Sequence, residues 1–167
     1  METRSYKVSD TGLYQQEVFK ILTEYELARA QRYPSPLTLL YISLEVKEPD
    51  AQVAASVRQV FASILNTCLR VSDIPAHYGQ DFVALLPVTD EVGGQAVAQR
   101  LISRLRGTRK LDGSMYKFDI HIGIATHPGG KSIAADTLIQ QAQTALLLAQ
   151  QSGPQSFMLF SGGKESS

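Results

Sequence analysis

The chain has 167 residues, no formal net charge, 44% hydrophobic and 19% charged residues, which predicts one soluble globular domain with a sizeable core. The zero net charge gives no electrostatic footprint for nucleic acid, and the single cysteine excludes an internal disulfide framework. Because no apolar run approaches the roughly 20 residues that span a bilayer and no apolar leader opens the chain, we expect a cytoplasmic protein without a membrane span.

The first part of the chain predicts a helix and then a central strand. Residues 1–9 are polar and unpatterned, and we interpret them as an N-terminal arm. Apolar side chains recur at helical spacing over residues 13–32, and Pro34 ends the pattern. The spaced residues are Val18, Ile21, Leu22, Tyr25, Leu27 and Ala28. Residues 37–45 are almost continuously apolar, as expected of a buried strand.

The middle of the chain predicts two more helices with a loop and a strand between them. Residues 53–70 show helical periodicity, and a polar loop begins at Arg70. A buried strand follows over residues 82–86. Residues 87–90 form a turn with a capping oxygen, and residues 92–106 predict the third helix.

The last part of the chain predicts a strand, a helix and a short strand. Residues 116–126 alternate apolar and polar side chains, which indicates a half-exposed strand. Residues 134–151 predict a fourth helix, residues 157–160 a last strand, and residues 161–167 a disordered tail. This order predicts an α+β fold in which helices cover a sheet.

A short motif follows the second helix. Arg70 and Asp73 stand three positions apart, five residues lead to Gly79, and Asp81 precedes the strand that begins at Phe82. This order resembles the signature of the GGDEF domain, the diguanylate cyclase family, which reads Arg-x-x-Asp, five residues, then Gly-Gly-Asp/Glu-Glu-Phe on a hairpin. The resemblance runs over residues 10–160. It implies the nucleotidyl-cyclase fold, a central, mostly antiparallel five-stranded sheet flanked by helices.

The resemblance also implies a catalytic site, and this chain departs from it on the first strand. Family members hold Mg²⁺ with carboxylates from the first strand and the hairpin, because Mg²⁺ prefers oxygen ligands. Ser43 stands at the position of the first carboxylate, and a neutral hydroxyl is a poor replacement. Glu45 points to the same face two positions later; its simpler interpretation is an exposed acid at the strand end.

The hairpin is one residue short of the family pattern, and two alignments are open. Counting back from Phe82 puts Gln80 at the metal-binding acid and Asp81 at the second acid. Counting forward from Gly79 makes Gln80 the second glycine and Asp81 the metal-binding acid. Either way one acid is missing and only one glycine of the pair remains.

Two further segments depart from the family pattern. Residues 47–52 are too short to hold the Asn and Asp that read the guanine edge in the family. Residues 149–155 lack the Lys and Arg that neutralise phosphate there. We therefore expect an inactive cyclase homologue, with no catalytic residue, no bound metal and no cofactor.

The resemblance implies that a second site of the family is retained. Arg70 and Asp73 stand at its inhibitory site, which binds an intercalated dimer of cyclic di-GMP. A guanidinium forks onto a guanine edge or a phosphate, and a carboxylate accepts hydrogen bonds from guanine N–H groups. Family members often add an arginine thirteen residues after the strand-ending proline, and counting from Pro87 reaches Arg100. The simpler interpretation is that Arg70 pairs with Asp73 across a turn and Arg100 is solvated.

Three hypotheses follow from the resemblance. The first is an inactive GGDEF domain that acts as a cyclic di-GMP receptor in bacterial second-messenger signalling, with Arg70, Asp73 and Arg100 as its ligand-binding residues. The second is a nucleotide-free scaffold for a homodimer or for a partner such as a sensor domain. The third is residual cyclase activity or GTP binding that uses Asp81 and Glu45.

Overall fold

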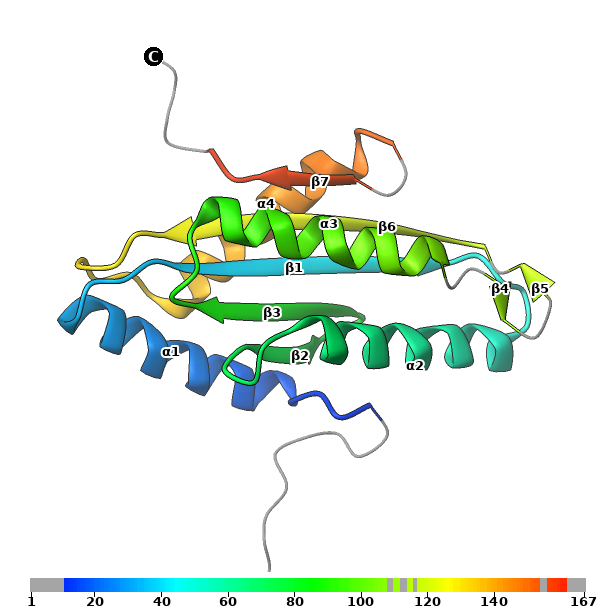
Figure 1. Ribbon diagram of the computed structural model, residues 1–167, viewed down its shortest axis with the longest axis horizontal. Coiled ribbons are helices and arrows are strands. Elements are labelled where there is room, and N and C mark those ends of the chain that lie inside the picture. The colour runs from blue at the N-terminus through cyan, green and yellow to red at the C-terminus, as the bar shows by residue number, and fades with distance from the viewer. Residues whose placement is uncertain (1–10, 108–109, 112–113, 116, 154–155, 162–167) are drawn as a thin grey trace, which may run out of the picture.

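A five-stranded sheet forms the centre of the protein (Figure 1). The computed structural model describes residues 11–107, 110–111, 114–115, 117–153 and 156–161, and the strand order is β2-β3-β1-β6-β7. The strands are β1 (Leu37–Val46), β2 (Ile74–Tyr78), β3 (Asp81–Pro87), β6 (Phe118–His127) and β7 (Ser156–Leu159). All neighbours pair antiparallel except β6 and β7, which are parallel. The predicted mostly antiparallel five-stranded sheet is confirmed.

In the described residues, four helices cover the two faces of this sheet, as Figure 1 shows. One face packs against α2 (Ala51–Cys68) and α3 (Glu91–Gly107), and the other against α1 (Gln16–Arg32) and α4 (Ala135–Gln150). A small hairpin of β4 (Lys110–Leu111) and β5 (Ser114–Met115) lies beyond the end of the sheet. No helix in the described ranges is long and apolar enough to cross a bilayer.

The position of β1 at the centre of the sheet explains why its sequence is almost continuously apolar. Leu40 and Ile42 pack toward α2 and α3, whereas Leu39 and Tyr41 pack toward α1 and α4. All four side chains are buried, and burying a side chain of this size contributes about 1.5–3 kcal/mol. With helices on both faces, residues 39–42 in the middle of the strand have no polar side.

The predicted half-exposed strand is wrong for β6. This strand is buried over most of its length, and even His121 is only 7% exposed, with Nε2 lying 2.8 Å from the carbonyl oxygen of Gly153. Gly123 explains the second buried face, since a Cβ there would lie 2.0 Å from the carbonyl oxygen of Ala142 in α4. The missing side chain lets α4 pack directly on the strand.

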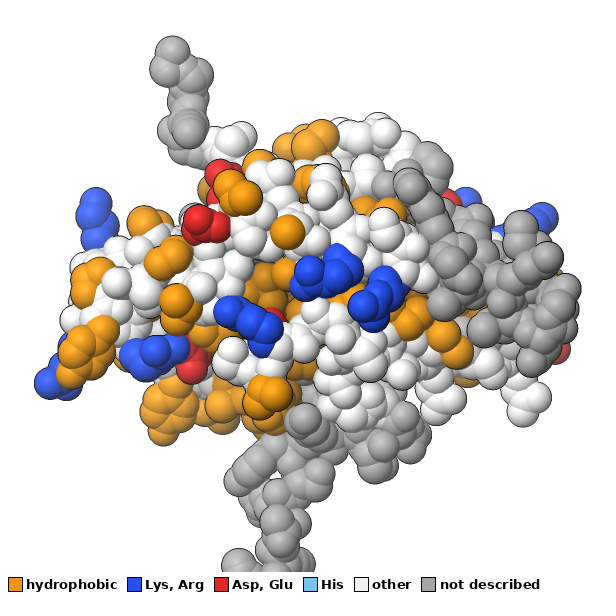
Figure 2. All heavy atoms as spheres, in the orientation of Figure 1, with side chains coloured by type: hydrophobic (Ala, Val, Ile, Leu, Met, Phe, Trp, Pro, Cys, Tyr) orange, Lys and Arg blue, Asp and Glu red, His pale blue; other side chains and the backbone are white. Residues whose placement is uncertain are grey.

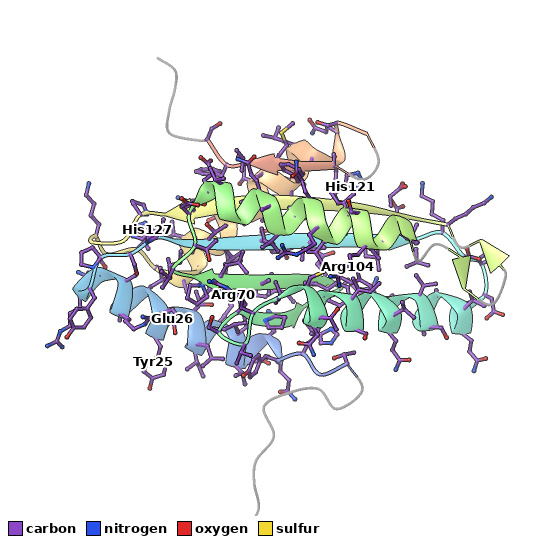
Figure 3. All side chains as sticks on the ribbon, in the orientation of Figure 1. Tyr25, Glu26, Arg70, Arg104, His121 and His127 are labelled. Carbon is purple, nitrogen blue, oxygen red and sulfur yellow. The ribbon has the colours of Figure 1, made fainter. Side chains whose placement is uncertain are left out.

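Helix α1 forms as predicted, but part of its periodic apolar pattern faces solvent. Ile21 is 58% and Tyr25 70% exposed, and Figure 3 shows Tyr25 pointing away from the body of the protein. The buried side is formed by Phe19, Thr23, Leu27 and Ala30. Thr23 is accommodated there because its hydroxyl donates to the carbonyl oxygen of Phe19 at 2.7 Å. The helix carries apolar residues on two sides, and the predicted set mixed them: Leu27 is buried, whereas Ile21 and Tyr25 face solvent.

The proposed terminal segments lie mostly outside the described residues. The arm over residues 1–9 and the tail over residues 161–167, of which only residue 161 is described, therefore stay predictions.

Candidate functional site

The loop between α2 and β2 is built around Asp73. The backbone N–H of Asp73 donates to the carbonyl oxygen of Arg70 at 3.0 Å, and the backbone N–H of Arg70 donates to Asp73 Oδ2 at 2.8 Å. These reciprocal bonds close a tight turn directly after the helix. The Asp73 side chain is only 2% exposed, whereas the Arg70 side chain is 55% exposed.

The Arg70 guanidinium is held on one edge by several acceptors. Its Nη2 lies 3.0 Å from Asp73 Oδ1, and its Nε lies 3.4 Å from Asp73 Oδ2. The same Nη2 donates to the carbonyl oxygen of Pro87 at 2.8 Å and to Thr89 Oγ1 at 2.7 Å. Arg70 and Asp73 therefore do pair across the turn. Because the Asp73 carboxylate is buried and the Arg70 guanidinium is exposed, a ligand arriving from solvent would meet Arg70 first.

A pocket of about 410 Å³ opens beside this pair, and Arg70, Asp73 and Arg100 all line it. Arg100 reaches it from α3, where its Nη2 donates to the carbonyl oxygen of Cys68 at the end of α2 at 3.1 Å. Leu86 and Val97 add apolar surface. Lys and Arg side chains gather around the middle of this face in Figure 2. The structure thus brings together the loop after α2, which carries Arg70 and Asp73, and Arg100 of α3.

The hairpin between β2 and β3 is tight. Tyr78 pairs with Asp81, which leaves Gly79 and Gln80 as a two-residue turn. Gly79 has φ of 61°, a left-handed conformation that favours glycine. Its N–H donates to Gln16 Oε1 at 2.9 Å, so the start of α1 holds the turn.

The strand register brings Asp81 next to Ser43. Ile42 of β1 pairs with Phe82 of β3, so the next positions, Ser43 and Asp81, fall opposite each other and point to the face that packs on α1 and α4. Gln80 instead lies in the exposed turn. Of the two candidate positions, it is therefore Asp81 and not Gln80 that lies beside Ser43.

Comparison with known proteins shows the family. The model of the family described as "Diguanylate cyclase, GGDEF domain" matches residues 51–156, more than half of the chain. The chain belongs to the GGDEF domain family. Members of this family act in cyclic di-GMP signalling, and they are in general diguanylate cyclases. No curated protein sequence matches this chain.

Solved GGDEF domains share the fold. A structure of only the GGDEF domain of TpbB (YfiN) from Pseudomonas aeruginosa has a TM-score of 0.79 at 23% identity, over 93% of this chain and 94% of that one. The GGDEF domain of DgcB from Caulobacter crescentus, solved in complex with c-di-GMP, has a TM-score of 0.78 at 17% identity, over 97% of each chain. The diguanylate cyclase SiaD from Pseudomonas aeruginosa, solved with its activator SiaC, has a TM-score of 0.80 at 22% identity, over 93% of this chain and 62% of that one.

The residues of this GGDEF domain do not fit the Mg²⁺ ions that the family uses. Ser43 offers a neutral hydroxyl, which accepts a hydrogen bond from Gln150 Nε2 at 3.4 Å. Asp81 is half-buried, and burial raises the pKa of its carboxyl group although Arg58 acts in the opposite direction. Glu45 lies farther along β1, opposite Asp119 of β6. Within the described ranges, no three His, Cys, Asp or Glu side chains lie together as metal ligands would.

Arg58 of α2 has a contact that the sequence did not indicate. Its Nη1 donates to the carbonyl oxygen of Leu44 at 3.1 Å, and its Nη2 donates to the carbonyl oxygen of Gln80. The guanidinium lies 5.1 Å from the centre of the Phe82 ring. Arg58 thereby fastens α2 to the hairpin, and no motif distinguishes it from other helix-surface arginines.

Thr89 was also missed at the site. The sequence predicted only a turn with a capping oxygen over residues 87–90. Asp90 supplies that cap, since its Oδ1 accepts from the N–H of Gly93 at 2.9 Å. Thr89 instead contacts Arg70, nineteen positions earlier in the chain, a contact that only the fold creates.

Proposed function

We propose that this GGDEF domain is catalytically inactive and acts as a receptor for cyclic di-GMP. The observation that carries the proposal is the shared pocket of Arg70, Asp73 and Arg100. Arg100 was identified by counting from Pro87 and played no part in aligning the Arg-x-x-Asp motif. Its position in the same pocket as the motif therefore supports the proposal independently.

The chemistry of the pocket suits a guanine dinucleotide. Two arginines, Arg70 and Arg100, offer planar donor groups that match phosphate oxygens and the acceptor edge of guanine. The apolar side chains of Leu86 and Val97 provide surface against which a base can pack. The pocket volume falls within the range of about 300–1,000 Å³ typical of small-molecule sites.

The proposed loss of catalysis rests on the other end of β3. The positions that would carry two carboxylates hold Ser43 and a half-buried Asp81, and the position of the family's phosphate-binding lysine on the last helix holds Gln150, which bonds Ser43. These positions would therefore offer only one acid to hold the metal ions, and no basic side chain to neutralise the charge of a triphosphate. Formation of cyclic di-GMP from GTP and Mg²⁺ by the purified domain would contradict this half of the proposal.

Calorimetric titration with cyclic di-GMP tests the receptor half. We expect micromolar affinity, about −8 kcal/mol. Arg70→Ala removes a charge-assisted donor and should cost about 1.5–3 kcal/mol of binding free energy. Arg29→Ala is the matched control, because Arg29 also pairs with an acid three residues away, Glu26, but lies on α1.

The outcomes separate the hypotheses. Binding that Arg70→Ala weakens and Arg29→Ala leaves unchanged supports the receptor. Equal affinity of the Arg70→Ala variant and the wild type would place the ligand elsewhere. No heat with the wild-type domain would favour the nucleotide-free scaffold, for which light scattering would then be expected to show a dimer or a partner complex.

A further inference from the structure

The segment between β3 and α3 holds Arg70 in addition to Asp73. Arg70 Nη2 carries two hydrogens but lies within bonding distance of three acceptors: Asp73 Oδ1 at 3.0 Å, the Pro87 carbonyl at 2.8 Å and Thr89 Oγ1 at 2.7 Å. At least one hydrogen is therefore shared between acceptors. The Nη1 hydrogens make none of these bonds, so this edge of the guanidinium is available to a ligand.

The backbone conformation explains how two of these acceptors reach one nitrogen. Val88 has φ of 49°, a left-handed conformation that β-branched residues rarely adopt. The chain reverses there, so the Pro87 carbonyl and the Thr89 side chain both meet Arg70. The Thr89 hydroxyl donates to the Pro87 carbonyl at 3.0 Å. Its single hydrogen is thus used, and its oxygen stays free to accept from Arg70.

The centre of the sheet anchors this segment. Thr38 of β1 is fully buried, and its Oγ1 lies within hydrogen-bonding distance of the Thr89 and Asp90 carbonyls, at 2.9 and 3.1 Å. The same oxygen lies 2.8 Å from Thr126 Oγ1 on β6. Thr89 is therefore fixed by a polar network that begins in the rigid interior, which is the arrangement expected of a residue that orients another.

We infer that Thr89 is a positioning residue of the ligand site: its hydroxyl holds Arg70 in the orientation that leaves Nη1 available for cyclic di-GMP. The inference rests on the proposed receptor function. A guanidinium ordered before binding loses less conformational freedom when the ligand arrives, and so binds it more tightly. Thr89 itself need not touch the ligand.

Calorimetry on three variants tests this role. Thr89→Val keeps the shape of the side chain but removes the hydroxyl, and should weaken cyclic di-GMP binding about three- to tenfold, the effect of one hydrogen bond. Thr89→Ser keeps the hydroxyl and should restore wild-type affinity. Thr144→Val is the matched control, because Thr144 lies on α4 and its hydroxyl donates only to the carbonyl oxygen of Gln140.

Nuclear magnetic resonance of the ligand-free domain gives a second readout that affinity alone does not provide. The guanidinium N–H signals of Arg70 should be separate in the wild type and in Thr89→Ser, because the held group rotates slowly. They should move closer together in Thr89→Val, where Nη2 keeps only Asp73 and Pro87 as acceptors and the group rotates faster. A Thr89→Val variant with wild-type affinity overturns the inference, as does equal weakening by valine and serine.

The two proposals fail in different ways. If the wild-type domain does not bind cyclic di-GMP, the proposed receptor function is wrong, and so is the role of Thr89 in binding. If the wild-type domain binds cyclic di-GMP but Thr89→Val leaves the Arg70 signals unchanged, only the positioning role of Thr89 is lost.

Discussion

The environment of Asp81 disfavours the charged form of its carboxyl group. Asp81 is half-buried near Tyr41 and Tyr78, and burial raises the pKa of its carboxyl group, opposed only in part by Arg58. Burial, and then the charges of Asp81 and Tyr78, raise the pKa of Tyr41 to about 12. In an active metal site a bound cation would stabilise such a carboxylate.

This raised pKa predicts the effect of Asp81→Asn. An acid whose pKa is higher in the folded state binds protons more readily when folded, so wild-type stability falls as pH rises from the ordinary value of 3.8 through the folded pKa. Asp81→Asn should therefore raise the melting temperature near neutral pH and leave it unchanged below pH 3.8. Thermal unfolding at both pH values checks this, with Glu24→Gln, an exposed acid on α1, as the control. A variant that melts below the wild type near neutral pH would show that the charge is favourable.

Helix α1 shows what sequence periodicity leaves open at the scale of an element. The position of the helix was predicted, but its spaced apolar residues include Ile21 and Tyr25, which face solvent, whereas Phe19 is fully buried. Spacing defines a side of the helix, but the contact with the sheet decides which side is buried. The same limit applies to β6, where Gly123 admits α4 against a face that was expected to be exposed.

Paired alanine substitutions measure this difference on α1. Phe19→Ala leaves a cavity beside Tyr78, whose ring lies 6.4 Å away, and should lower the free energy of unfolding by about 3–5 kcal/mol. Tyr25→Ala removes a side chain that is 70% exposed and should change it by no more than about 0.5 kcal/mol. Urea denaturation compares the two. A large loss with Tyr25→Ala would indicate that another molecule covers this side of α1 in solution.

Part of the arrangement around the pocket could be anticipated from the sequence. The family resemblance selected Arg70 and Asp73, counting from Pro87 selected Arg100, and the fold brings all three to the lining of one pocket. That they bind a ligand stays a prediction. The sequence did not identify Thr89 or Arg58, whose contacts join residues 19 and 22 positions apart across the fold. Nor did it show that Asp73 is buried beneath Arg70, since that depends on how the loop closes.

At the scale of the whole molecule, strand β3 separates the two sites. Asp81 begins the strand beside Ser43, and Pro87 ends it at the carbonyl that accepts from Arg70. At about 3.4 Å per residue the two ends lie roughly 20 Å apart. The pocket lined by Arg70 and Arg100 also opens on the α3 side of the sheet, whereas Ser43 and Asp81 face α1 and α4. A small ligand at one end therefore leaves the backbone at the other end untouched.

Mapping the backbone amide signals during a titration with cyclic di-GMP tests this separation most directly. We expect shifts that saturate together at Arg70, Asp73, Thr89 and Arg100, while the signals of Ser43 and Gly79 stay in place. Shifts concentrated at Ser43 and Gly79, or none at any of these residues, would contradict this expectation.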